Sequence, residues 1–352
     1  MEKKGLSLFE RYLSLWVALC IITGVLIGQF MPGVPKFLSK MEYAHVSIPV
    51  AILIWLMIYP MMLKIDFTSI KNVGNKPKGL IVTWVTNWII KPFSMYLIAY
   101  FFLKIVFKAY IPENLSTEYL AGAVLLGAAP CTAMVFVWSY LTKGDPAYTL
   151  VQVATNDLII LFAFTPIVAF LLGVSNVKVP YDTLILSTIL FVVIPLTLGY
   201  LTRKRVVSSK GLEYLENEFL KKFDNITIIG LLLTLVIIFS FQGEIIVKNP
   251  FHILLIAVPL TIQTFFIFFF AYGWAKVWKL PHDVAAPAGL IGASNFFELA
   301  VAVAISLFGL QSGAALATVV GVLTEVPIML TLVRIANATK AHFDFDKKGQ
   351  AA

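Results

Sequence analysis

Long apolar segments, separated by short polar loops, recur along the whole chain. A helix needs about 20 consecutive apolar residues to cross a bilayer, and each segment comes near that length or exceeds it. The pattern therefore predicts an all-α integral membrane protein with ten transmembrane helices. The expected spans are Leu15 to Met31, Val46 to Leu63, Gly79 to Leu103, Tyr119 to Leu141, Thr149 to Leu172, Thr183 to Thr202, Asn225 to Phe241, Phe251 to Ala275, Val284 to Phe308 and Gly313 to Ile335.

Composition supports this interpretation. The chain has 352 residues, of which 59% are hydrophobic and 13% are charged, whereas charged residues make up about 25% of soluble domains. The first span lacks a small-residue cleavage site, so we expect it to be retained rather than removed as a signal peptide. The spans leave no room for a soluble domain between them.

The net charge of +8 would fit an acidic partner such as nucleic acid, but the distribution of the charge favours another explanation. If the amino terminus is cytoplasmic, the loops on that side hold 20 Lys and Arg residues and the opposite loops hold six, with Lys91 inside a span. This asymmetry predicts a multi-pass protein of the plasma or inner membrane with both termini in the cytoplasm. It gives no reason to expect a nucleic-acid partner.

Two segments of the chain resemble each other weakly. "LLGAAPCTAMVFV" from Leu125 aligns with "LIGASNFFELAVA" from Leu290 at an offset of 165 residues, which pairs Gly127 with Gly292. The following spans align at an offset of 169, so the repeating unit contains five spans. Because five is odd, the second copy is inverted in the membrane, as in many secondary transporters. We therefore expect one membrane domain made of two repeats, residues 1–175 and 176–352.

Four residues that carry a formal charge lie within or near the apolar spans: Lys91, Asp157, Glu298 and Glu325. A charged group costs about 2.5–3.5 kcal/mol at the centre of a membrane helix, so each is a candidate for function. Asn295 and Glu298 have the spacing of a helix start, with Asn295 as the N-cap. A helix start at mid-span predicts a broken helix, where Glu298 either caps the second half or binds and releases a proton.

Pro130 and Cys131 lie in the middle of the fourth span. Proline breaks a helix interior but is favoured at a first helical position. We therefore expect one half-helix to end near Ala128 and another to begin at Pro130, which would put Cys131 in its first turn. Exposed N–H groups there would stabilise a thiolate. A soft thiol near a titratable carboxylate indicates a thiophilic substrate coupled to protons.

Other polar residues have weaker signals. Lys91 is expected to neutralise Asp157 or Glu325, either for function or as a purely structural ion pair. Asp157 with Asn156 and Glu325 with Thr324 occupy equivalent places in the two repeats and would serve an ion route or support the crossing. The expected cavity-lining residues are Trp138, Ser139 and Asn87.

No enzyme or cofactor motif is present. The sequence contains neither a Walker loop nor an HExxH motif, and its four His residues are scattered. The two cysteines, Cys20 and Cys131, both fall within spans and are expected to be free thiols. We therefore predict no enzymatic activity, no cofactor and no obligate protein partner, and any active transport must be driven by an ion gradient.

The segments "GAAPCTAMVFVWS", "TNWIIKPF", "ATNDL", "GASNFFELAVAVA" and "TEVPIML" together resemble the arsenical-resistance-3 type of arsenite efflux permease, within the bile acid/arsenite/riboflavin transporter superfamily. The resemblance covers essentially the whole chain. It implies ten spans in an inverted five-span repeat, with discontinuous, crossing fourth and ninth helices and with core and panel domains. One departure is Pro130, where some members carry a basic residue.

The resemblance also implies a function. It assigns the family's essential cysteine to Cys131 and its span-nine glutamate to Glu298, and it implies proton-coupled extrusion of trivalent arsenite, with antimonite as a further substrate of some members. The expected substrate-binding residues are Cys131, Glu298, Trp138, Ser139 and Asn295, with Cys131 as the ligand of As(III) or Sb(III). The alternatives left open are a sodium-coupled organic anion symporter of the bile acid carrier type, and a membrane sensor or passive channel.

Overall fold

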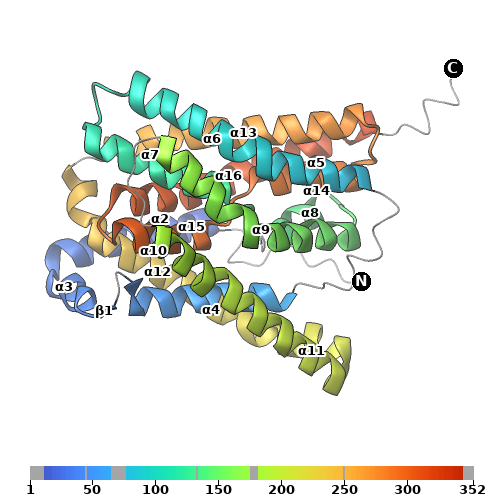
Figure 1. Cartoon of the computed structure of the whole chain (residues 1–352), viewed down its shortest axis with the longest axis horizontal. Coiled ribbons are helices and arrows are strands. Elements are labelled where there is room, and N and C mark those ends of the chain that lie inside the picture. Colours follow the sequence, from blue (N-terminus) through green and yellow to red (C-terminus); the bar gives the residue numbers. More distant parts are fainter. Residues whose placement is uncertain are drawn as a thin grey trace, which may run out of the picture.

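The computed structural model describes residues 12–43, 46–64, 77–131, 134–174, 181–248 and 250–343. These ranges are almost entirely helical (Figure 1). The exception is a small antiparallel ribbon, in which β1 (Glu42–Tyr43) pairs with β2 (Val46–Ser47). The predicted boundary between the repeats at residue 175 lies outside the described residues, as do several of the basic residues that predict the orientation.

Every predicted span falls mainly on helical structure, although the second span begins with the two residues of β2. The helices of the first five spans are α2 (Leu13–Phe30); α4 (Ile48–Lys64); α5 (Pro77–Val85), η2 (Thr86–Ile90), α6 (Lys91–Tyr100) and η3 (Phe101–Val106); α7 (Glu113–Ala128) and α8 (Val135–Leu141); and α9 (Pro146–Val174). Those of the last five are α10 (Tyr181–Thr188), η4 (Ile189–Val193) and α11 (Ile194–Tyr214); η5 (Leu215–Phe219) and α12 (Lys221–Lys248); α13 (Phe251–Val277); α14 (His282–Ala293) and α15 (Phe297–Phe308); and α16 (Gly313–Ala338). Two short helices, α3 (Gly33–Ser39) and η6 (Lys340–Phe343), lie outside the spans.

Five helical stretches of the described residues are long and apolar enough to cross a membrane. They are Pro77–Val106, Pro146–Val174, Tyr181–Phe241, Phe251–Val277 and Gly313–Ala338. Three other apolar helices among the described residues are shorter, Ala18–Phe30, Ile48–Pro60 and Phe297–Phe308, and the last of them is short because the chain interrupts the helix between α14 and α15. The helices fit a multi-pass membrane protein, and the full number of crossings stays a prediction.

The helices pack in two groups. In the first group α12 packs against α2 and α4, and α4 also packs against α11. In the second group α7 lies between α6 and α16, while α13 packs against α14 and α16. Figure 1 shows α4 and α11 along one edge of the molecule and α5, α6 and α13 along the opposite edge. The broken helices α7–α8 and α14–α15 belong to the second group.

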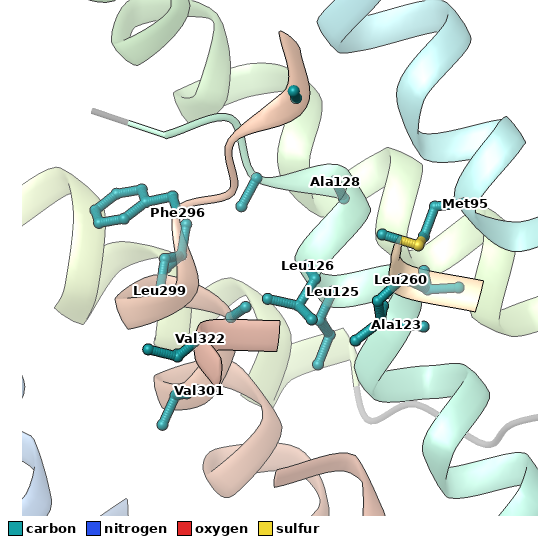
Figure 2. Packing of buried hydrophobic residues seen from close by; sticks show 14 of the residues in the cluster. Met95, Ala123, Leu125, Leu126, Ala128, Leu260, Phe296, Leu299, Val301 and Val322 are labelled. Carbon is teal, nitrogen blue, oxygen red and sulfur yellow. The ribbon is translucent and has the colours of Figure 1, made fainter. Parts of the chain in front are cut away.

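Small residues let α7 approach its neighbours closely, as is common between membrane helices. A Cβ atom on Gly122 would lie 2.8 Å from the Cβ of Ala317 on α16, and a Cβ on Gly127 would lie 2.7 Å from the Cγ of Met95 on α6. Figure 2 shows Met95 beside the last turn of α7, where Ala128 lies. Glycine therefore fixes how close the broken helix sits to both partners.

Replacing Gly122 by leucine is expected to destabilise the protein by about 1–3 kcal/mol, because the larger side chain overpacks the α7–α16 contact. The measurement is the melting temperature of the detergent-purified protein. Gly273→Leu is the matched control, since a Cβ on Gly273, also inside a helix, meets nothing within 4 Å. Equal melting temperatures for the two variants would contradict the close packing.

Candidate functional site

Two helices of the second group are interrupted near the middle of their predicted spans. Helix α7 ends at Ala128 and α8 begins at Val135, while α14 ends at Ala293 and α15 begins at Phe297. Pro130 explains the first interruption, because a proline lacks the N–H that would continue the helical hydrogen bonds. Both interruptions agree with the breaks predicted from the sequence.

The two linkers pair with each other. Pro130 and Asn295 form an antiparallel β-bridge. On either side of it the Phe296 N–H donates to the Ala129 carbonyl at 2.8 Å, and the Cys131 N–H donates to the Ser294 carbonyl at 3.4 Å. The backbone N–H and carbonyl groups that leave the helical ladder at one break thus bond to groups of the other break. Such pairing is necessary because water is not there to bond them. Pro130 and Asn295 are also equivalent in the alignment of the two repeats.

The pairing moves Cys131 out of the position predicted for it. The second half-helix begins at Val135 rather than at Pro130, so Cys131 lies in the linker and not in a first helical turn. Ala129 is already extended, with φ −115° and ψ 103°, because the chain pairs with the opposite linker before it turns helical again. The predicted position of Cys131 in a first helical turn is therefore wrong, but the N–H of Met134, the N-cap of α8, still donates to the Cys131 sulfur.

The start of α15 also differs from the prediction. Phe296, not Asn295, is the N-cap, no side chain caps this helix, and Glu298 is its second residue. The predicted capping box is therefore wrong. The Asn295 side-chain oxygen is buried and has no hydrogen-bond partner among the described residues. Glu298 still lies in the first turn, where the positive end of the helix dipole favours a carboxylate.

Cys131 lies in a small, mainly apolar cluster of buried side chains. It is 5% exposed and packs with Val135, Val153 and Ile291. Its polar contacts are the Ser294 side chain and the Met134 backbone N–H, and it interacts electrostatically with the carboxylates of Glu298 and Glu325. Glu298 is 6% exposed, so neither the thiol nor this carboxylate is open to bulk water. The structure therefore brings the predicted thiol and the predicted carboxylate into one closed region.

A polar network holds the α14–α15 linker. The Lys91 ammonium donates to the Ser294 carbonyl at 2.6 Å. The Ser294 hydroxyl donates to the Glu325 carboxylate, which also accepts the Asn295 N–H at 3.2 Å. Lys91 is thus connected to Glu325 through Ser294, as one of the two partners predicted for it. All four residues are buried.

Lys91 follows an irregular turn. Residues Thr86–Ile90 form a π-helical segment, and the Lys91 N–H donates to the Thr86 carbonyl instead of the carbonyl of residue 87. Pro92, which cannot donate, comes next. Such π segments are frequent at functional sites. Here the segment sets the direction from which Lys91 reaches the opposite helix break.

The other predicted residues lie in less connected places. Trp138 and Asn87 are buried, and the Trp138 indole N–H and both amide atoms of Asn87 have no hydrogen-bond partner among the described residues. The Ser139 hydroxyl pairs with that of Thr149 at 2.7 Å, a contact that joins α8 to α9. Asn156 and Asp157 are buried in α9, and the Asn156 side chain accepts from the Trp88 indole at 2.9 Å.

Two residues of the site were missed by the sequence analysis. Ser294 joins Lys91 to Glu325, and Gln152 donates to the Thr83 hydroxyl at 3.0 Å. Both are polar residues inside apolar spans, but neither carries the formal charge that marks Lys91, Asp157, Glu298 and Glu325. Among the described residues, no group of three or more His, Cys, Asp or Glu side chains is placed to hold a metal ion. The chemistry of the site therefore rests on one thiol and a few oxygen and nitrogen groups.

Comparison with known proteins gives a consistent set of relatives. Residues 51–249 match the family described as Sodium Bile acid symporter family. The chain is 75% identical over 342 residues to the arsenical-resistance protein Acr3 of Alkaliphilus metalliredigens, covering 97% of this chain and 96% of that protein. It is 48% identical to an uncharacterized transporter of Synechocystis, with coverage of 97% and 91%. It is 31% identical to the arsenical-resistance protein Acr3 of Corynebacterium glutamicum, with coverage of 93% and 88%.

Proposed function

Because the chain belongs to the Sodium Bile acid symporter family, as a transporter of the Acr3 arsenical-resistance type, we propose that it extrudes trivalent arsenite from the cytoplasm in exchange for protons. The observation that supports this most strongly is the pairing of the two helix breaks, which encloses Cys131 with Glu298 and Glu325. We also propose antimonite as a second substrate of the transporter, because it has the same valence as arsenite and likewise prefers sulfur ligands.

Cys131 is the proposed ligand of the metalloid. Trivalent arsenic prefers soft sulfur ligands. Neutral arsenous acid binds when one of its hydroxyl groups is replaced by the Cys131 sulfur and leaves as water, taking the thiol proton. A single As–S bond is reversible, as a carrier requires, whereas three thiols would trap the substrate. Trp138, Ser139 and Asn295 are proposed to line the substrate's path. The Asn295 side-chain oxygen, which has no hydrogen-bond partner among the described residues, could accept from a hydroxyl group of arsenous acid.

Glu298 is the proposed proton-coupling group. It is a buried carboxylate at the start of α15, and an intramembrane carboxylate is a common proton carrier in transporters. In the proposed cycle the inward-facing protein binds arsenite at Cys131 while Glu298 releases a proton to the cytoplasm. The outward-facing protein then takes up a proton, releases arsenite and returns.

The surrounding polar residues are proposed to support this cycle. Lys91 and Glu325 hold the α14–α15 linker through Ser294, and Asn156 holds α9 against η2 through Trp88. Asn87, which precedes Trp88 in the sequence, and Asp157, which follows Asn156, are also buried. We assign these residues to the polar core of the transporter rather than to direct binding of arsenite.

The proposal includes an architecture of ten spans in two inverted repeats. The bridge between Pro130 and Asn295 supports it, because these residues are equivalent in the two repeats and meet in antiparallel directions. The two packing groups of helices fit a core that moves against a panel. With basic loops inside, the protein would lie in the plasma or inner membrane with both termini in the cytoplasm.

The second candidate function is a sodium-coupled organic anion symporter, which the name of the matching family favours. This function would require a sodium gradient and would not require the Cys131 thiol. A channel or sensor would accumulate nothing against a gradient. The presence of Cys131 at the paired breaks is the reason to prefer arsenite.

Everted membrane vesicles separate these functions. We expect arsenite to accumulate in vesicles with an acidic lumen and not in response to a sodium gradient, because lumenal protons leave as arsenite enters. Collapse of the pH gradient with a protonophore is the control. Uptake driven by sodium alone, with no response to pH, would favour the symporter instead.

A further inference from the structure

The Lys91 ammonium occupies an unusual place for a positive charge. Its side chain is fully buried, and it lies within the apolar stretch Pro77–Val106. Burial of an ammonium group costs several kcal/mol unless fixed partners replace its water. Among the described residues, the partner of Lys91 Nζ is the Ser294 carbonyl at 2.6 Å. The charge is therefore held at one particular carbonyl group.

That carbonyl belongs to the end of a broken helix. Ser294 is the C-cap of α14, and its extended backbone, with φ −84° and ψ 148°, takes it out of the helix. The carbonyl end of a helix carries a partial negative charge. In transporters with broken helices, such carbonyl ends and the unwound backbone beside them coordinate the coupling sodium ion.

Further oxygen atoms belong to the same linker and to Glu325, which holds it. One oxygen of the Glu325 carboxylate accepts from Ser294 and Asn295. The other Glu325 oxygen and the Asn295 side-chain oxygen are buried and have no hydrogen-bond partner among the described residues. A carbonyl, a carboxylate and an amide oxygen are the ligand types that hard cations prefer. The Lys91 ammonium contacts the Ser294 carbonyl directly and is close enough to the Glu325 carboxylate to interact with it electrostatically.

We propose that Lys91 is a tethered cation, whose ammonium group fills the cation position at the end of α14 and so removes the need for a sodium ion there. The inference rests on the proposed function in one respect, since it explains how a member of a sodium symporter family would work without sodium. Its structural part, a latent cation site beneath Lys91, does not depend on the substrate.

Two substitutions at Lys91 test this. Lys91→Ala removes the charge and leaves a cavity beside the oxygen atoms, so it should expose a site for a small cation. Lys91→Met removes the charge but keeps the volume, so it should leave no room for one. The purified variants and the wild type are compared in sodium chloride and in choline chloride at equal ionic strength, first by melting temperature and then by arsenite uptake in vesicles.

We expect sodium to raise the melting temperature of Lys91→Ala by a few degrees in a saturable way, as a ligand that binds only the folded state does. Sodium should not stabilise the wild type or Lys91→Met beyond choline. If Lys91→Ala can be purified as a folded protein in sodium chloride but not in choline chloride, this also shows that sodium stabilises the variant. Equal stability of Lys91→Ala in both salts, or failure to fold in either, would overturn the proposal.

Transport provides the second readout. Lys91→Ala should lose arsenite uptake in choline and recover it in sodium, whereas Lys91→Met should be inactive in both salts. Full activity of Lys91→Met would overturn the tethered-cation role. If the wild type carries no arsenite at all, the proposed function fails, while the sodium effect on the melting temperature still decides whether the cation site exists.

Discussion

Replacing Cys131 by serine is expected to reduce arsenite uptake into everted vesicles to the level of vesicles without the protein. The substitution changes one atom in a buried cluster and leaves the packing with Val153 and Ile291 nearly intact. A hydroxyl group has little affinity for trivalent arsenic compared with a thiol, because the metalloid is soft. The measurement is the initial rate of uptake under an acidic lumen, normalised to the amount of protein in the membrane.

Cys20 provides the matched control. It is the other cysteine of the chain, and it is also buried, in α2 of the first packing group. Cys20→Ser should transport at the rate of the wild type, and the double variant should behave as Cys131→Ser alone. Retained uptake by Cys131→Ser would exclude the thiol as the arsenite ligand.

Glu298→Gln is expected to abolish accumulation driven by the pH gradient while leaving arsenite binding intact. The amide keeps the size of the side chain but cannot release a proton, and Cys131 is unchanged. Uptake is measured at several lumenal pH values in everted vesicles, and binding is measured on the purified variant as the arsenic retained per protein. The wild type should respond to lumenal pH and the variant should not.

The control removes a glutamate outside the membrane-spanning segments. Glu113 forms a surface ion pair with Lys104, with 2.8 Å between Nζ and the carboxylate. The hydrogen bond from Lys104 holds the pKa of the Glu113 carboxyl below its usual value, and exposed pairs of this kind contribute little to stability. Glu113→Gln should therefore keep the response to pH. A pH response in Glu298→Gln equal to that of the wild type would rule out Glu298 as the coupling group.

The positions of the helices and of both interruptions could be predicted from the sequence. Apolar runs of bilayer length define helices directly, because a backbone in lipid must satisfy its own hydrogen bonds. Pro130 indicated one break because it cannot donate, and the polar residues after Ala293 indicated the other. The weak alignment of the two repeats even equated Pro130 with Asn295, which the structure pairs.

The local geometry of the breaks could not be predicted in the same way. Capping rules put Cys131 in a first helical turn and made Asn295 an N-cap, because they consider one segment at a time. In the folded chain the two linkers hydrogen-bond to each other, and this long-range pairing overrides the local preferences. Ser294 is visible in the sequence as a polar residue inside an apolar span, but its role could not be predicted, because it depends on Lys91 and Glu325, which lie far away in sequence.

The most direct test of the central claim, that Cys131 binds arsenite at the paired breaks, is arsenic X-ray absorption spectroscopy of the purified protein with bound arsenite. We expect one sulfur and two oxygen neighbours of arsenic in the wild type and in Cys20→Ser, and only oxygen neighbours in Cys131→Ser. A sulfur neighbour that persists in Cys131→Ser, or none in the wild type, would contradict the claim.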